Sequence, residues 1–149
     1  MVQTVFDEGA ATFSPDSSML AFQSAQSGRW EIYVQRIVDG GPIVVSTGGV
    51  ERPVWTRDGL FYQSAGAIRR ATVRVASDGL VVDSLTEVPL TEADRRGLQS
   101  GATLQRIGPD GSVVLSQSEQ ARQTSAVVSL EWIREVRRAL GPPEARLPR

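Results

Sequence analysis

Short runs of alternating apolar and polar residues fill most of the chain, and turns rich in Gly, Asp and Pro separate them. Runs of about 4–8 residues bounded in this way are typical of β-strands, because successive side chains of a strand point to opposite faces. The pattern predicts two successive groups of strands. The first group comprises residues 19–24, 31–37 and 42–47, and the second comprises residues 60–64, 67–75 and 80–86.

An aspartate-containing turn recurs along the chain. Asp16 and Asp58 are 42 positions apart, Asp58 and Asp110 are 52 apart, and an apolar run ending in Gln-Ser follows each turn. A repeat of about 40–45 residues with four short strands is typical of a β-propeller blade. The sequence therefore predicts an all-β fold, a partial β-propeller of about three four-stranded antiparallel blades, with a polar connection in the longer interval. The expected blades are residues 5–48, 49–97 and 98–130, and the expected connection is residues 84–101.

The second repeat is shorter by two residues between its turn and its closing serine. That interval is eight residues from Asp16 to Ser24 and six from Asp58 to Ser64. Because side chains in a strand alternate with a period of two, a loss of two residues keeps each side chain on its original face. We expect a tighter hairpin with the same buried face.

The pattern changes near the C-terminus. Residues 125–130 are typical of a strand, whereas residues 131–141 carry apolar side chains at helical spacing and end in Gly-Pro-Pro. We expect a short C-terminal helix there, followed by a loose tail at residues 142–149. Its apolar stripe consists of Trp132, Ile133, Val136, Ala139 and Leu140.

The composition removes most catalytic chemistry. The 149 residues include no Cys, His, Lys or Asn, so thiolate nucleophiles, histidine bases and Schiff-base lysines are excluded. Sulfur and histidine ligands for a metal are excluded as well. The formal net charge is −1, which gives no basic field for nucleic acid. We also find no bilayer-spanning apolar run and no secretory signal pattern.

The recurring turn residues are the first candidate site, and we interpret them as structural. An aspartate in a turn accepts hydrogen bonds from neighbouring backbone N–H groups, and proline presets the backbone angle beside it. The alternative is a metal or substrate ligand, but an active site needs converging groups, whereas these occur once in each blade. We expect no catalytic, cofactor-binding or metal-binding residues. The turn residues are Pro15, Asp16, Asp58, Gly59, Pro109, Asp110 and Gly111.

Three further groups of side chains have a structural and a functional interpretation. The positions of the aromatic residues in alternating strands indicate packing between blades rather than a platform for stacking sugars or peptides. Trp30 and Tyr62 are the two residues to test for exposure. The acidic pairs and arginine clusters favour surface charge over acid–base, metal or phosphate chemistry. The aromatic residues are Phe13, Phe22, Trp30, Tyr33, Trp55, Phe61 and Tyr62; the charged groups are Asp7–Glu8, Glu92–Asp94, Arg69–Arg70, Arg95–Arg96 and Arg137–Arg138.

Residues 13–34, "FSPDSSMLAFQSAQSGRWEIYV", resemble the WD-like repeat of TolB-type β-propellers. Residues 40–64 and the end of the chain resemble the C-terminal propeller region of bacterial Ser/Thr protein kinase–propeller proteins. The chain departs from that pattern at Ser17, Arg57 and Glu131. The resemblance implies a non-catalytic module for ligand sensing or protein–protein interaction, with any kinase chemistry in a separate domain. The residues themselves give no cellular location, and an extracytoplasmic one in a bacterium is compatible with the resemblance alone. The alternative is an accessory propeller that gates an oligopeptidase-type hydrolase.

The number of blades sets an expectation about partners. A propeller closes with about 4–8 blades, and this chain supplies about three. We expect other blades of the same polypeptide, or of another chain, to complete it, together with an unidentified protein or small-molecule ligand. Neither nucleic acid nor membrane insertion is expected. Because three blades leave an open face, we expect the isolated chain to self-associate or to be marginally stable.

Overall fold

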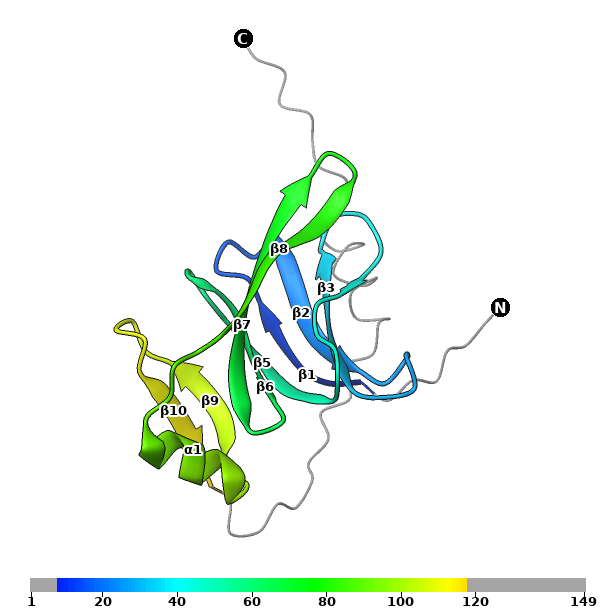
Figure 1. The fold of residues 1–149 in the computed structure, drawn as a ribbon. Helices are drawn as coiled ribbons and strands as arrows, with labels where there is room; N and C mark the ends of the chain where they lie inside the picture. The colour runs from blue at the N-terminus through cyan, green and yellow to red at the C-terminus, as the bar shows by residue number, and fades with distance from the viewer. Residues whose placement is uncertain (1–7, 118–149) are drawn as a thin grey trace.

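The computed structural model describes residues 8–117, which are mostly β-structure with one short helix. The first four strands form one antiparallel sheet in the order β1-β2-β3-β4, so each strand pairs with its neighbour in the sequence. Figure 1 shows this sheet in blue and cyan. Its strands are β1 (Glu8–Phe13), β2 (Met19–Ser24), β3 (Glu31–Arg36) and β4 (Ile43–Val44).

The next four strands repeat this topology in a second sheet, with the order β5-β6-β7-β8. The prediction of successive four-stranded antiparallel sheets is confirmed for both. A long hairpin, β7–β8, extends beyond the body of the second sheet (Figure 1). The strands are β5 (Val50–Thr56), β6 (Gly59–Ser64), β7 (Ala67–Ala76) and β8 (Gly79–Glu87).

Strand β4 is much shorter than the six residues expected at 42–47. The reason is a side-chain hydrogen bond at Ile32, the residue of β3 next to Tyr33, which pairs with Val44. The Ser46 hydroxyl accepts a hydrogen bond from Ile32 N at 2.7 Å, in the place where a strand would offer a backbone carbonyl. A side-chain acceptor at this position ends the backbone ladder, so β4 consists of Ile43 and Val44 only.

The connection after the second sheet was predicted as polar, and no helix was expected in it. It contains a helix, α1 (Glu92–Gln99), which begins inside the expected boundary of the second blade. Thr91 caps the helix: its hydroxyl accepts from Asp94 N at 3.2 Å, and Thr91 N donates to the Asp94 carboxylate at 3.3 Å. This reciprocal pair is a capping box. The acidic pair at residues 92–94 therefore belongs to a helix N-terminus rather than to a loop.

A third unit begins with a two-stranded hairpin, β9 (Thr103–Ile107) and β10 (Val113–Ser116). The expected four-stranded third blade is thus represented by two strands in the described part of the chain. The rest of that blade, the expected helix at residues 131–141 and the tail at 142–149 lie outside the described residues. Among residues 8–117, the sheets do not close into a ring.

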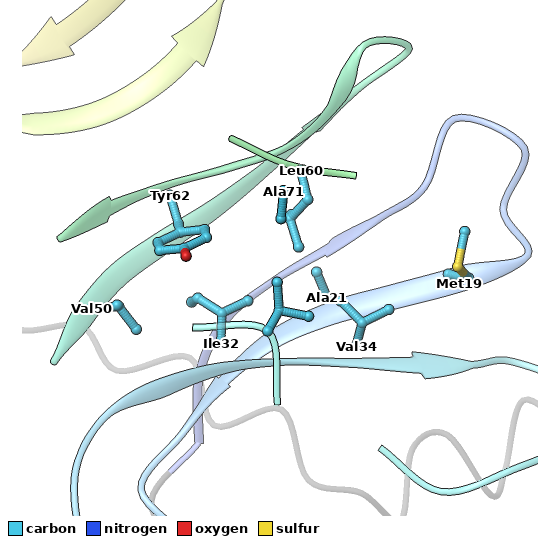
Figure 2. Packing of buried hydrophobic residues seen from close by; sticks show 9 residues of the cluster. Met19, Ala21, Ile32, Val34, Val50, Leu60, Tyr62 and Ala71 are labelled. Atoms are coloured by element: carbon cyan, nitrogen blue, oxygen red, sulfur yellow. The ribbon is translucent and has the colours of Figure 1, made fainter. Parts of the chain in front are cut away.

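Successive units pack face to face through apolar cores. The first core lies between the two four-stranded sheets and joins Ile32 and Val34 of β3 to Leu60 and Tyr62 of β6 (Figure 2). A second core joins the opposite face of the second sheet to α1 and the β9–β10 hairpin. Its buried members are Phe61, Ile68, Leu98, Leu104 and Ile107.

Strand β6 keeps the same buried face despite the two-residue shortening of its hairpin, as predicted. Counted back from the closing serines, Leu60 and Tyr62 are equivalent to Leu20 and Phe22, and Phe61 is equivalent to Ala21. Phe61 faces the third unit, just as Ala21 faces the second sheet. The shorter hairpin therefore preserves which face of the sheet meets the next unit.

Candidate functional site

The first turn is built around the Asp16 carboxylate. Its Oδ1 accepts hydrogen bonds from Ser14 Oγ at 2.6 Å and from Ser18 N at 3.1 Å. These hydrogen bonds lower the pKa of Asp16 to about 2, and the bond from the Ser14 hydroxyl has the largest effect. Ser17 has a positive φ of 57°, and it stands where the resembling repeat has Gly. Asp16 thus stabilises a strained turn that follows Pro15.

The third turn uses the same device. Asp110 Oδ1 accepts from Ser112 N at 3.0 Å, and hydrogen bonds from Ser112 lower the pKa of this carboxyl. Pro109 precedes it in the turn, and Gly111 follows with φ 82°. The side-chain acceptor is again an aspartate that binds the backbone two residues ahead.

The second turn is different. β5 and β6 are joined by two residues only, and the side-chain acceptor is the Thr56 hydroxyl, which accepts from Asp58 N at 3.1 Å. Gly59 has φ 140°, and a Cβ there would lie 2.8 Å from Ala71 O. The recurring aspartates therefore lie in three separate turns, and the tight second turn depends on Gly59 rather than on the Asp58 carboxylate.

A recurring glutamine, which the sequence interpretation did not single out, links each sheet to the next. Gln23 of β2 donates from Nε2 to Val50 O of β5 at 2.6 Å. Gln63 of β6 donates from Nε2 to Ala102 O at 3.3 Å and accepts at Oε1 from Leu104 N of β9 at 3.1 Å. The repeated Gln-Ser ending of the apolar runs was the available signal. These glutamines join neighbouring units by contacts to backbone atoms.

Glu31 organises the connection between the first two sheets. Its carboxylate is almost fully buried and accepts from Arg29 Nε at 2.7 Å, Ser46 Oγ at 2.6 Å and Gly48 N at 2.9 Å. Burial alone would raise the pKa of Glu31. The three hydrogen bonds, with the nearby Arg29 charge, outweigh burial and hold the pKa below its ordinary value. The side chain therefore remains ionised and fixes the segment that leaves β4.

A cavity of about 350 Å³ opens beside this network. It lies on the face of the first sheet that carries Tyr33 and Val44, which are paired across β3 and β4. Arg29 is well exposed at its rim, whereas Glu31 forms part of its wall. The cavity thus presents a guanidinium group, a tyrosine ring and hydroxyl groups to a small ligand. It is lined by Ser27, Gly28, Arg29, Glu31, Tyr33, Val44, Ser46 and Thr47.

The aromatic residues divide between core and surface. Tyr62 is 1% exposed, and Phe22 stacks on Tyr33 with ring centroids 5.9 Å apart. Trp30 is 37% exposed and Phe13 is 42% exposed, so packing between blades does not describe these two. Trp30 lies in the same β2–β3 connection as Arg29 and is the exposed aromatic side chain nearest the cavity in sequence.

The remaining charged candidates do not gather into one site. Arg69 pairs with Glu87 across β7 and β8 at 3.7 Å, and Arg95 and Arg96 lie on α1. Arg137–Arg138 and Asp7 lie outside the described residues. Within residues 8–117, no group of three or more acidic, cysteine or histidine side chains could hold a metal ion. The same part of the chain contains no helix with the length and apolarity needed to cross a bilayer.

No protein-family model, curated protein or solved structure matches the chain. Its likeness to TolB-type repeats therefore depends on the sequence motifs quoted above. The repeated sheets and the glutamine contacts are observed in the structure, and they are the features from which a function must be argued.

Proposed function

We propose that this chain is a β-propeller segment that binds a protein or small-molecule ligand without transforming it. The observation that carries the proposal is repetition. Two sheets share one strand order, pack face to face, and pass to the next unit through an equivalent glutamine. Repeat architectures of this kind stack units so that each contacts its neighbours, and they present loops from successive units on a common side.

We place the binding surface at the β2–β3 connection. Arg29 is exposed there at the rim of the cavity, and the next residue, Trp30, is partly exposed but does not line the cavity. Tryptophan and arginine are two of the residue types that are enriched among the side chains contributing most of the binding energy at protein interfaces. By resemblance, the polypeptide that contains this segment would also contain a bacterial receptor-like Ser/Thr kinase domain. A kinase domain encoded upstream would support that part of the proposal, and a peptidase domain there would contradict it.

Selection of displayed random peptides on the immobilised chain, followed by calorimetry, tests the binding surface. We expect enriched peptides whose affinity falls at least about tenfold for Trp30→Ala, corresponding to about 1.4 kcal/mol. Val38→Ala is the matched control, because Val38 is also exposed but follows the opposite end of β3. Equal affinity for the wild type and Trp30→Ala would contradict the placement. Peptidase and ATPase assays should show no turnover, and turnover abolished by a Ser or Asp substitution would contradict the non-catalytic part.

A further inference from the structure

The turn between β2 and β3 positions Arg29 at the rim of the cavity. Gly28 N donates to Ala25 O at 2.9 Å, and Gly28 has a positive φ of 87°. The Ser27 hydroxyl donates to Arg29 O at 3.2 Å. The guanidinium group is held by Glu31, which accepts from Arg29 Nε at 2.7 Å. Both the backbone and the guanidinium group of Arg29 are therefore held in place by the chain itself.

The hydrogen bond to Glu31 occupies Nε of Arg29 and leaves the two terminal amino groups open. Among residues 8–117, the Arg29 side chain donates from Nε alone, so Nη1 and Nη2 keep their N–H groups for a ligand. The Arg29 side chain is 63% exposed, whereas that of Glu31 is 2% exposed. Both Glu31 oxygens already accept hydrogen bonds, Oε1 from Arg29 and Gly48, and Oε2 from Ser46. The charge that the cavity offers to a ligand is thus positive.

Part of the cavity wall is apolar. Tyr33 and Val44 are paired across β3 and β4, and both line the cavity. Val44 is 49% exposed, so its side chain is accessible to a ligand, and Thr47 adds an exposed hydroxyl group. The volume of about 350 Å³ is near the lower end of the range of small-molecule sites, which is about 300–1,000 Å³. The cavity therefore suits a short ligand with one polar end and one apolar end.

We propose that the cavity binds a carboxylate attached to a short apolar group, an inference that rests on the proposed function and names its ligand class. The N–H groups on Nη1 and Nη2 match the two oxygens of a carboxylate, and the apolar group packs against Tyr33 and Val44. Two sources share this chemistry: a free carboxylic acid, and the C-terminus of a peptide with an apolar last residue.

A doubly charged phosphate fits the cavity less well. Arg29 is the one cation among the described residues that line it, and the ionised Glu31 carboxylate beside Arg29 balances its charge. A second negative charge on the ligand would have no cation to pair with. The apolar wall likewise offers no hydrogen-bond donor to a third phosphate oxygen.

Calorimetry on the full chain with matched probes tests the ligand class. The probes are N-acetyl-alanyl-valine with a free carboxylate, the same peptide with a C-terminal amide, and 3-methylbutanoate. We expect the peptide acid to bind at least about tenfold more tightly than the amide, because the amide lacks the charge and one acceptor oxygen. Binding of 3-methylbutanoate within about threefold of the peptide acid would assign the site to a free carboxylic acid, and binding at least about tenfold weaker would assign it to a peptide C-terminus. Both results support a carboxylate site.

Substitution of Arg29 tests the residue that carries the proposal. Arg29→Gln should weaken binding of the peptide acid at least about tenfold and leave the amide unchanged. Arg57→Gln is the matched control, because Arg57 is exposed, the charge change is the same and Arg57 does not line the cavity. If Arg29→Gln prevents folding by circular dichroism, Thr47→Glu replaces it, since it adds a negative charge at an exposed position and keeps the Arg29–Glu31 pair; the same loss is expected.

Four results would overturn the proposal: no binding of either peptide, equal affinity for acid and amide, inorganic phosphate binding as tightly as the acid, or an affinity that Arg29→Gln leaves unchanged. These outcomes are distinguishable from failure of the proposed function. Displayed peptides that bind through Trp30, with acid and amide probes equal, would retain the binding surface and remove the carboxylate. Carboxylate binding without any Trp30-dependent peptide would do the reverse.

Discussion

Replacing Gln63 by leucine removes the hydrogen bonds between the second sheet and the third unit while keeping most of the side-chain volume. The amide donates to Ala102 O and accepts from Leu104 N, and both partner residues are buried. After the substitution, the two backbone groups have no side-chain partner. The change therefore measures how strongly these contacts couple neighbouring units.

Two hydrogen bonds between neutral groups contribute about 0.5–1.5 kcal/mol each, and buried backbone groups left without a hydrogen-bond partner add to the loss. Leucine loses less rotamer freedom on folding than glutamine does, and this difference offsets part of the loss. We expect a loss of about 2 kcal/mol in the free energy of unfolding, close to a 30-fold change in the unfolding equilibrium. For a chain of this size the melting temperature should fall by about 4–8 °C.

Urea denaturation followed by circular dichroism gives the measurement, with Gln105→Leu as the matched control. Gln105 is exposed and, among residues 8–117, its side chain bonds only to the Thr103 hydroxyl, so its loss should cost less than about 0.5 kcal/mol. If Gln63→Leu also stays within about 0.5 kcal/mol of the wild type, the glutamine contacts do not couple the units and the reasoning fails.

Three other substitutions can be measured by the same denaturation. The pKa of Glu31 is lowered in the folded state, so its contribution to the free energy of unfolding is present above the unfolded pKa near 4.5 and is lost as the pH falls through the folded pKa. Glu31→Gln should therefore cost about 1–3 kcal/mol at pH 7 and distinctly less at pH 3, and a pH-independent loss would contradict this. Tyr62→Phe should change stability by less than about 0.5 kcal/mol, since the buried Tyr62 hydroxyl has no hydrogen-bond partner in the described part of the chain, and a loss above about 1 kcal/mol would reveal one. Gly59→Ala should cost at least about 2 kcal/mol more than Gly66→Ala, because both have positive φ but only Gly59 lies against Ala71 O; equal losses would show that the contact relaxes.

Most strands were predictable because short apolar or alternating runs between turn residues report directly on burial. In β6, for example, Leu60 and Tyr62 face one core while Phe61 faces the other, so the whole run is apolar and bounded by turn residues. Helix α1 was not predictable in this way. It buries only Leu98, so no apolar stripe marks it, and its one signal is the capping pair of Thr91 and Asp94.

The contacts of the candidate site were less predictable than its residues. The repeated glutamine is visible in the sequence, but Gln63 binds backbone atoms about forty positions away, which leave no mark in composition or periodicity. Glu31 has no feature in the sequence that distinguishes it from other charged residues in strands. Its burial follows from Ser46 and Gly48 folding back over it, an arrangement that depends on the path of the chain after β4.

The glutamine contacts also bear on how such a chain can change during evolution. Gln23 and Gln63 bind main-chain atoms, and the residues they bind, Val50, Ala102 and Leu104, differ in type. A unit can thus acquire new side chains at these positions without losing its attachment to the unit before it. Duplication or exchange of whole units requires no compensating substitution at this contact, so the loops that bind ligands can diverge while the units remain joined.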